Sequence, residues 1–101
     1  MARDGPGGFD WDRHNVGHVA RHKVTKAEVE QVLKNDPDFV GEQISESGEK
    51  RFLELGHTDK IRVLFVAWTL RGKLIRPVTA FDASEEIRSA YLINRFGVNE
   101  Q

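Results

Sequence analysis

The chain has 101 residues, a length that suits a single domain able to bury a core without covalent cross-links. It contains no cysteine, which excludes disulfides and thiolate metal sites and agrees with the reducing cytoplasm, where we expect the protein to act. The net charge of −1 argues against nucleic-acid binding through the whole surface, and no apolar run approaches the ~20 residues of a membrane span.

The two ends of the chain carry no periodic apolar pattern. Residues 1–8, MARDGPGG, are rich in glycine, and we expect them to form a flexible tail. We expect residues 9–96 to form one domain and residues 97–101 to form a C-terminal tail.

The first predicted helix follows Trp11. Asp12 is a suitable N-cap, because its carboxylate can accept a hydrogen bond from the free N–H groups of the first turn. Apolar residues recur at helical spacing from there, which predicts a helix over residues 13–22. Its expected inner stripe is Val16, Val19 and Ala20.

A second helix begins within a few residues of the first. Thr25 and Glu28 form a capping box, in which the side chain of each residue accepts a hydrogen bond from the backbone N–H of the other. The predicted helix covers residues 26–35 and is ended by Asp36 and Pro37. The short connection makes the two helices an antiparallel hairpin.

The period of the apolar pattern then changes from helical to strand-like. Four strands are predicted, over residues 39–44, 51–56, 61–70 and 74–80. Residues 61–70 are apolar on both faces, which predicts a central strand covered on both sides. Pro77 cannot donate a ladder hydrogen bond, so a bulge or an unpaired stretch is expected in the last strand.

A second capping box, from Asp82 to Glu85, opens a final helix that runs to about Arg95. Its inward-facing residues are expected to be Ile87, Ala90 and Tyr91. The fold class is therefore α+β, with an N-terminal helical hairpin, a four-stranded antiparallel sheet and a C-terminal helix.

Three histidines, His14, His18 and His22, recur every fourth residue and share one face of the first helix. The first and the third are about 12 Å apart along the helix axis, so all three cannot hold one ion. A metal site would need two of them and a carboxylate such as Asp12. The alternative is a polar helix face, and we expect no metal and no cofactor.

Charge is segregated along the chain. Residues 27–49 carry seven acidic residues and one lysine, whereas residues 50–76 carry seven basic and two acidic residues. This separation permits local binding of phosphate despite the neutral total. The four arginines on or beside the predicted strands are Arg51, Arg62, Arg71 and Arg76.

Arginine binds phosphate oxygens through a planar fork and keeps its charge at any physiological pH. These side chains are therefore candidates for binding a phosphate group and neutralising its charge. The face of the sheet to which each arginine points depends on the register of its strand, because a shift of one residue moves the side chain to the other face. The alternative is that they are ordinary solvated strand residues.

Two stretches of the chain resemble one known family. The pattern WD-x-x-N-x-x-H-x-ARH-x-VT-x-x-EVE at residues 11–30 and the stretch LFVAWTLRGKLIRPVTA at residues 64–80 are similar to BrnT-type toxins, which are RelE-like ribonucleases of bacterial toxin–antitoxin pairs. The resemblance extends over about residues 9–92 and includes Arg88 and Tyr91 of the last predicted helix.

The resemblance implies a RelE-like fold, an RNA substrate, and a cognate ribbon–helix–helix antitoxin as partner. It implies a metal-independent endoribonuclease that inhibits translation and growth, and it leaves self-association open. The residues expected to be catalytic are Arg76, Arg71, His22 and Tyr91; those expected to bind RNA phosphate are Arg51, Arg62 and Arg88.

The sequence departs from the family pattern at two informative positions. Phe81 stands where an arginine is expected, and Ile87 stands where a glutamate is expected. These departures favour an alternative, in which the fold binds an antitoxin-like protein or nucleic acid without cleaving RNA. An apolar residue at position 81 would then enlarge a partner-binding surface.

Overall fold

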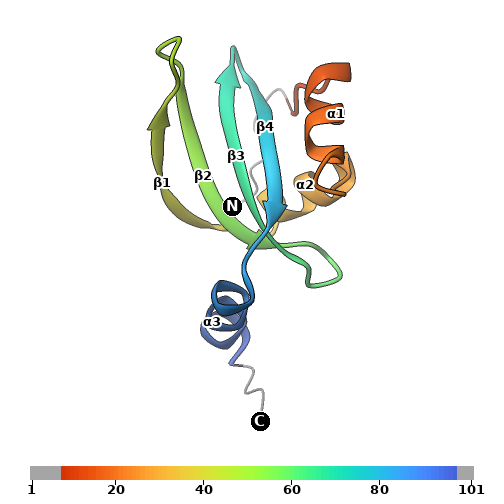
Figure 1. The fold of residues 1–101 in the computed structure, drawn as a ribbon, viewed down its shortest axis with the longest axis vertical. Helices are drawn as coiled ribbons and strands as arrows, with labels where there is room; N and C mark the ends of the chain where they lie inside the picture. Colours follow the sequence, from red (N-terminus) through yellow and green to blue (C-terminus); the bar gives the residue numbers. More distant parts are fainter. Residues whose placement is uncertain (1–7, 98–101) are drawn as a thin grey trace.

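The computed structural model describes residues 8–97 and confirms the α+β class (Figure 1). The predicted tails, residues 1–8 and 97–101, lie outside the described residues except for Gly8 and Gly97. No helix among the described residues is long and apolar enough to cross a membrane. The elements are α1 (Arg13–Ala20), α2 (Lys26–Lys34), β1 (Asp38–Ile44), β2 (Lys50–His57), β3 (Val63–Arg71), β4 (Leu74–Asp82) and α3 (Glu85–Phe96).

The four strands form one antiparallel sheet in the order β1-β2-β3-β4, so each strand pairs with its neighbour in sequence. All four predicted strands are present, and each end lies within two residues of its predicted position. The largest internal difference is at Ile61, which was expected to begin β3. Ile61 instead has a left-handed φ of 64° and donates its N–H to the Thr58 carbonyl in a turn, so the strand starts at Val63.

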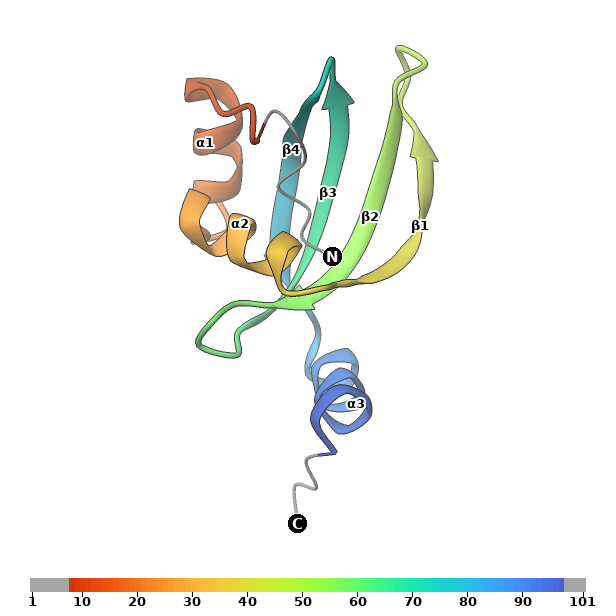
Figure 2. The ribbon, with the colours of Figure 1, turned by 180° about the vertical axis from the view of Figure 1, so that it is seen from behind.

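Helices α1 and α2 pack on one face of the sheet and enclose the main core (Figure 2). The predicted stripe of α2 is confirmed, because Val29, Val32 and Leu33 are fully buried. They pack against strand residues that include Leu64 and Val66, also fully buried. This burial of apolar side chains is the main stabilising term for the domain.

Helix α1 is rotated from the predicted orientation. Val19 is buried as expected, but Ala20 is exposed and Asn15 is 2% exposed, so the predicted inner stripe is wrong in part. The Asn15 amide donates hydrogen bonds to the carbonyls of Pro77, at 2.9 Å, and of Asp10, at 3.0 Å. These bonds fix α1 against β4 and turn the flank that carries its first two histidines toward the sheet.

Helix α3 lies beyond one end of the sheet, away from the other two helices (Figure 1). Its N-cap is Ser84, not Asp82, which still belongs to β4. Tyr91 is buried as expected and packs with Leu92 against Val63, whereas Ile87 and Ala90 are exposed. That part of the prediction is wrong because α3 meets the sheet only at its end and buries a narrower stripe.

The second face of β3 is less covered than predicted. Within residues 8–97, α1 and α2 lie on one face, and α3 reaches only one end of the sheet. On the opposite face, Leu53 and Phe65 are half-buried and Phe81 is 37% exposed. We call this face the open face; it carries the candidate site.

Candidate functional site

A cleft of about 290 Å³ lies between α1 and the end of the sheet opposite α3. Three arginines from three successive strands meet in it: Arg51 of β2, Arg71 of β3 and Arg76 of β4. Two histidines of α1 line the cleft with them. Its lining residues are His14, Asn15, His18, Glu49, Arg51, Thr69, Arg71, Arg76, Pro77 and Val78.

A β-bulge places Arg76 in this cleft. Ala67 of β3 pairs with Thr79, but two residues later Thr69 pairs with Arg76, because β4 contains one extra residue at this point. Without the bulge Pro77 would stand opposite Thr69, and Arg76 would point to the helix-covered face. The irregularity predicted from Pro77 is confirmed, and it decides which side chain faces the open side.

Carboxylates hold the three guanidinium groups in place. Glu49 lies between two of them, with its Oε1 3.0 Å from Arg51 Nε and its Oε2 3.7 Å from an Arg71 nitrogen. Arg71 is the most accessible, with its side chain 57% exposed. The Glu49 carboxylate shows that one oxyanion fits between these two guanidinium groups.

Arg76 is held from the N-terminal side. Its side chain is only 12% exposed and contacts Asp10 at 3.4 Å and Asp12 at 3.1 Å. Asp12 is also the N-cap of α1, where it accepts from the N–H groups of His14 and Asn15. The pKa of the Asp12 carboxyl is lowered, first by the Asn15 N–H and then by the Arg76 charge.

Two of the three helix histidines line the cleft, and His22 does not. The pKa of the His18 imidazole is lowered, first by burial and then by the positive charges of Arg21 and the other two histidines, with Arg51 adding to the effect. His18 is therefore a neutral imidazole at neutral pH, the form that can accept a proton. The ring of His22 lies 6.0 Å from the ring of Phe81, outside the lining of the cleft.

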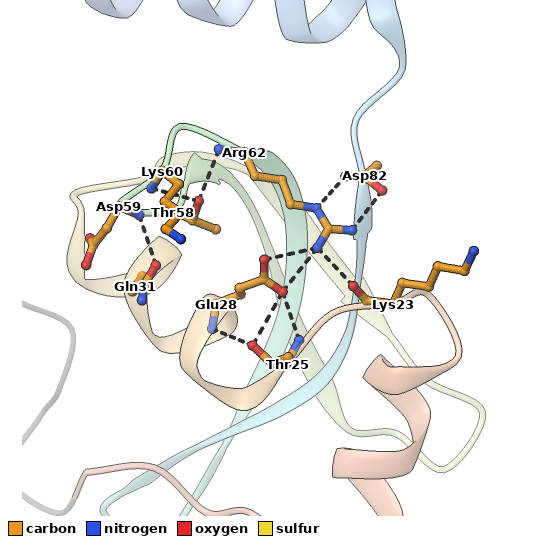
Figure 3. A network of polar contacts seen from close by, with 9 residues as sticks. All are labelled: Lys23, Thr25, Glu28, Gln31, Thr58, Asp59, Lys60, Arg62 and Asp82. Atoms are coloured by element: carbon orange, nitrogen blue, oxygen red, sulfur yellow. Dashed lines mark hydrogen bonds and ion pairs between the residues drawn. The ribbon is translucent and has the colours of Figure 1, made fainter.

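Arg62 lies in a separate ion-pair network between the end of β4 and α2 (Figure 3). Its Nε and Nη2 donate to both carboxylate oxygens of Asp82 at 2.8 and 3.0 Å. Its Nη1 donates to the Lys23 carbonyl and to Glu28. These bonds raise the pKa of Arg62 and lower that of Asp82. The guanidinium therefore ties three segments together, and the structure does not bring it to the cleft.

Tyr91 and Arg88 belong to α3, which the structure places far from the cleft. The Tyr91 hydroxyl lies 2.7 Å from His57 Nδ1, and burial raises the pKa of this tyrosine. His57 is six residues along β2 from Arg51, a span of about 20 Å at ~3.3 Å per residue. Arg88 is an exposed residue of the same helix. The structure thus brings together Arg51, Arg71 and Arg76 of the predicted site, and it separates the other four.

The sequence pattern alone did not identify His14 and His18 as members of this site, and it did not single out Glu49. The available signal was the four-residue spacing of His14, His18 and His22, which indicated a shared face without saying what that face meets. Across residues 8–97, no group of three or more histidine, cysteine or acidic side chains is arranged to hold a metal ion.

Fold and cleft together define a small α+β domain whose sheet ends in an arginine- and histidine-lined cleft, a composition that suits an anionic phosphate. Residues 11–86 match the family model described as the ribonuclease toxin, BrnT, of type II toxin–antitoxin systems. Because the match covers more than half of the sequence, the chain belongs to the BrnT family. Membership implies an RNA substrate and an antitoxin partner. No curated protein gives a significant match.

Proposed function

We propose that this protein is a metal-independent endoribonuclease that cleaves RNA in the cleft and thereby inhibits translation and growth. The observation that carries the proposal is the convergence of Arg51, Arg71 and Arg76 beside the neutral imidazole of His18. These groups match the two needs of the reaction, which are neutralisation of phosphate charge and transfer of protons.

The chemistry follows the usual course of metal-free RNA cleavage. The 2′-oxygen attacks the adjacent phosphorus, and the bond from phosphorus to the 5′-oxygen breaks, giving a 2′,3′-cyclic phosphate and a 5′-hydroxyl. The phosphate would take the place that the Glu49 carboxylate now occupies between Arg51 and Arg71. The two guanidinium groups would then hold the phosphate oxygens. Arg76, fixed by Asp10 and Asp12, would add the third positive charge.

Proton transfer is assigned to the cleft histidines. His18, whose lowered pKa keeps it neutral, takes the proton of the 2′-hydroxyl. His14 lines the same cleft and is assigned the transfer of a proton to the leaving 5′-oxygen. This assignment replaces His22 and Tyr91, which the sequence had suggested, because their side chains do not line the cleft.

The antitoxin partner is proposed to be a ribbon–helix–helix protein that covers the open face and its cleft. Covering this surface would block RNA, and the DNA-binding fold of the partner would link the pair to promoter DNA. Induction of the toxin alone should arrest growth, and co-induction of the antitoxin should relieve the arrest.

The direct test is cleavage of single-stranded RNA by purified protein in the presence of EDTA. Arg71→Gln should lower kcat/KM by about 10²–10³-fold, the usual loss for a removed donor to a transition-state oxyanion. Arg71 is mostly exposed, so the variant should fold. Lys26→Gln, which removes one exposed charge from α2, is the matched control. Parental activity in Arg71→Gln would remove the cleft from consideration, and loss of activity on adding EDTA would overturn metal independence.

One observation favours a second candidate, an interaction module that binds without cleaving. Each of the three cleft arginines already has a carboxylate partner within 3.7 Å, so RNA must displace these contacts to reach them. This candidate predicts saturable binding of the antitoxin or of RNA with no cleavage product, under conditions where the folded state is verified.

A further inference from the structure

Three aromatic rings form a row of successive ring contacts at β4, an edge strand of the sheet. Phe65 of β3 and Phe81 of β4 are paired across the sheet, and their rings are stacked at 5.4 Å with an interplanar angle of 29°. The His22 imidazole also neighbours Phe81, at 6.0 Å between ring centroids. Phe65 is half-buried, whereas Phe81 and His22 are exposed.

The row is continuous with the arginine cleft. Phe65 and Thr69 point to the same face of β3, four residues apart, which is about 13 Å at ~3.3 Å per residue. Thr69 lines the cleft and pairs with Arg76. The paired residues between the row and the cleft are Ala67 and Thr79, and their side chains are short. A short extended segment of a bound polymer could therefore contact both the aromatic row and the arginine cleft.

A single strand of nucleic acid matches this arrangement. Its phosphates need cations, and its unpaired bases stack on aromatic side chains. The open face offers the cations at the end of the sheet and a ring row further along the same strands. Phenylalanine has no hydrogen-bonding atom, so stacking and apolar contact are what it can offer.

We propose that Phe81, supported by Phe65 and flanked by His22, is a stacking platform for an unpaired nucleobase of the RNA strand whose phosphate lies in the arginine cleft. The proposal rests on the proposed function and narrows its substrate to single-stranded RNA with a free base beside the cut. It also gives position 81, where the family pattern has an arginine, a role in substrate selection.

The test compares Phe81→Leu and Phe81→Trp with the parent. Leucine keeps an apolar side chain but loses the ring, so KM for a single-stranded oligoribonucleotide should rise about tenfold or more, with kcat little changed. Phe81→Trp keeps an aromatic ring, so its KM should equal that of the parent. Phe39→Leu, which removes an exposed phenylalanine from β1, is the matched control and should have no effect.

A second measurement separates this proposal from the proposed function. Binding of an uncleavable oligonucleotide, with 2′-deoxyribose at every position, is measured with and without one abasic residue placed in turn along the strand. The parent should lose affinity at one abasic position, and Phe81→Leu should be insensitive to it. The stacking platform would be overturned if the parent cleaves RNA and Phe81→Leu has the same KM and the same binding. The proposed function would stand in that case.

Two other outcomes are equally decisive. A parent that cleaves no RNA, yet binds the oligonucleotide through Phe81, would end the proposed function and leave the platform. A Phe81→Leu variant that loses the antitoxin while binding RNA as the parent does would assign the ring row to a protein partner and overturn the proposal.

Discussion

At the scale of single residues, the chemistry of the cleft depends on how its charges act on one another. His18 has four cationic or potentially cationic neighbours, and burial adds to their effect, so its protonated form is disfavoured. Arg51, which would bind phosphate, thus also helps to keep the neighbouring base in its active form. Arg21 contributes to this effect although it does not line the cleft.

This coupling predicts the pH dependence of cleavage. Because the pKa of His18 lies below its usual 6.5, the rate should rise with pH through that lowered value and be level on this limb by pH 7. Arg21→Gln removes a positive charge that lowers this pKa, so the acid limb of the kcat/KM profile should move to higher pH. Arg13→Gln, at the other end of α1, is the control. A limb that moves equally in both variants, or moves to lower pH in Arg21→Gln, would contradict the assignment of His18.

At the scale of elements, helix α3 is attached by few contacts. Tyr91 and Leu92 pack against Val63, and the Tyr91 hydroxyl is paired with His57. The Arg95 guanidinium lies over the Tyr91 ring at 5.3 Å and donates to the Asp36 carbonyl. These contacts give Tyr91 a structural role that does not depend on the cleft.

Tyr91→Phe tests this role. Losing one half-buried hydrogen bond should cost about 1 kcal/mol of unfolding free energy and lower Tm by about 4–8 °C. Because Tyr91 lies far from the cleft, kcat/KM of the variant at 25 °C should stay within about twofold of the parent. Arg88→Gln, an exposed change on the same helix, should leave both quantities unchanged. A large loss of kcat with an unchanged Tm would instead make Tyr91 catalytic. Thermal melting and RNA cleavage are measured on the same preparations.

At the scale of the whole molecule, the cations that face the substrate are concentrated at one end of a nearly neutral protein. Arg62 is withdrawn into its own ion pairs, and acidic side chains dominate the stretch from α2 to the β1–β2 turn. RNA should therefore bind through few phosphate contacts, in contrast to a protein that is basic all over.

The salt dependence of RNA binding measures the number of those contacts. For single strands the slope of log K against log salt is about −0.7 per neutralised phosphate, so two or three contacts predict a slope between about −1.4 and about −2.1. Arg71→Gln should make the slope shallower by about 0.7, and Lys26→Gln should leave it unchanged. Fluorescence anisotropy with the uncleavable oligonucleotide gives both slopes, and a slope that Arg71→Gln does not alter would exclude Arg71 as a phosphate ligand.

The sequence by itself determined the elements, their order and the fold class. The capping box of Thr25 and Glu28, the apolar stripe of α2 and the turn signals between strands act over a few residues, so a linear pattern contains them. The irregularity at Pro77 was predictable for the same reason, since a residue without an N–H disturbs its own strand. The family resemblance was also carried by local motifs.

Only the tertiary structure decided which of the candidate residues share a site. The bulge in β4 turned Arg76 to the open face, and the hydrogen bond from Asn15 to Pro77 rotated α1 so that His18, not His22, lines the cleft. In the sequence Arg62 is equivalent to the other strand arginines. In the structure it is paired with Glu28 and Asp82, which are distant from it in the chain. Each of these outcomes depends on register or on contacts between residues far apart in the chain, and no local pattern encodes them.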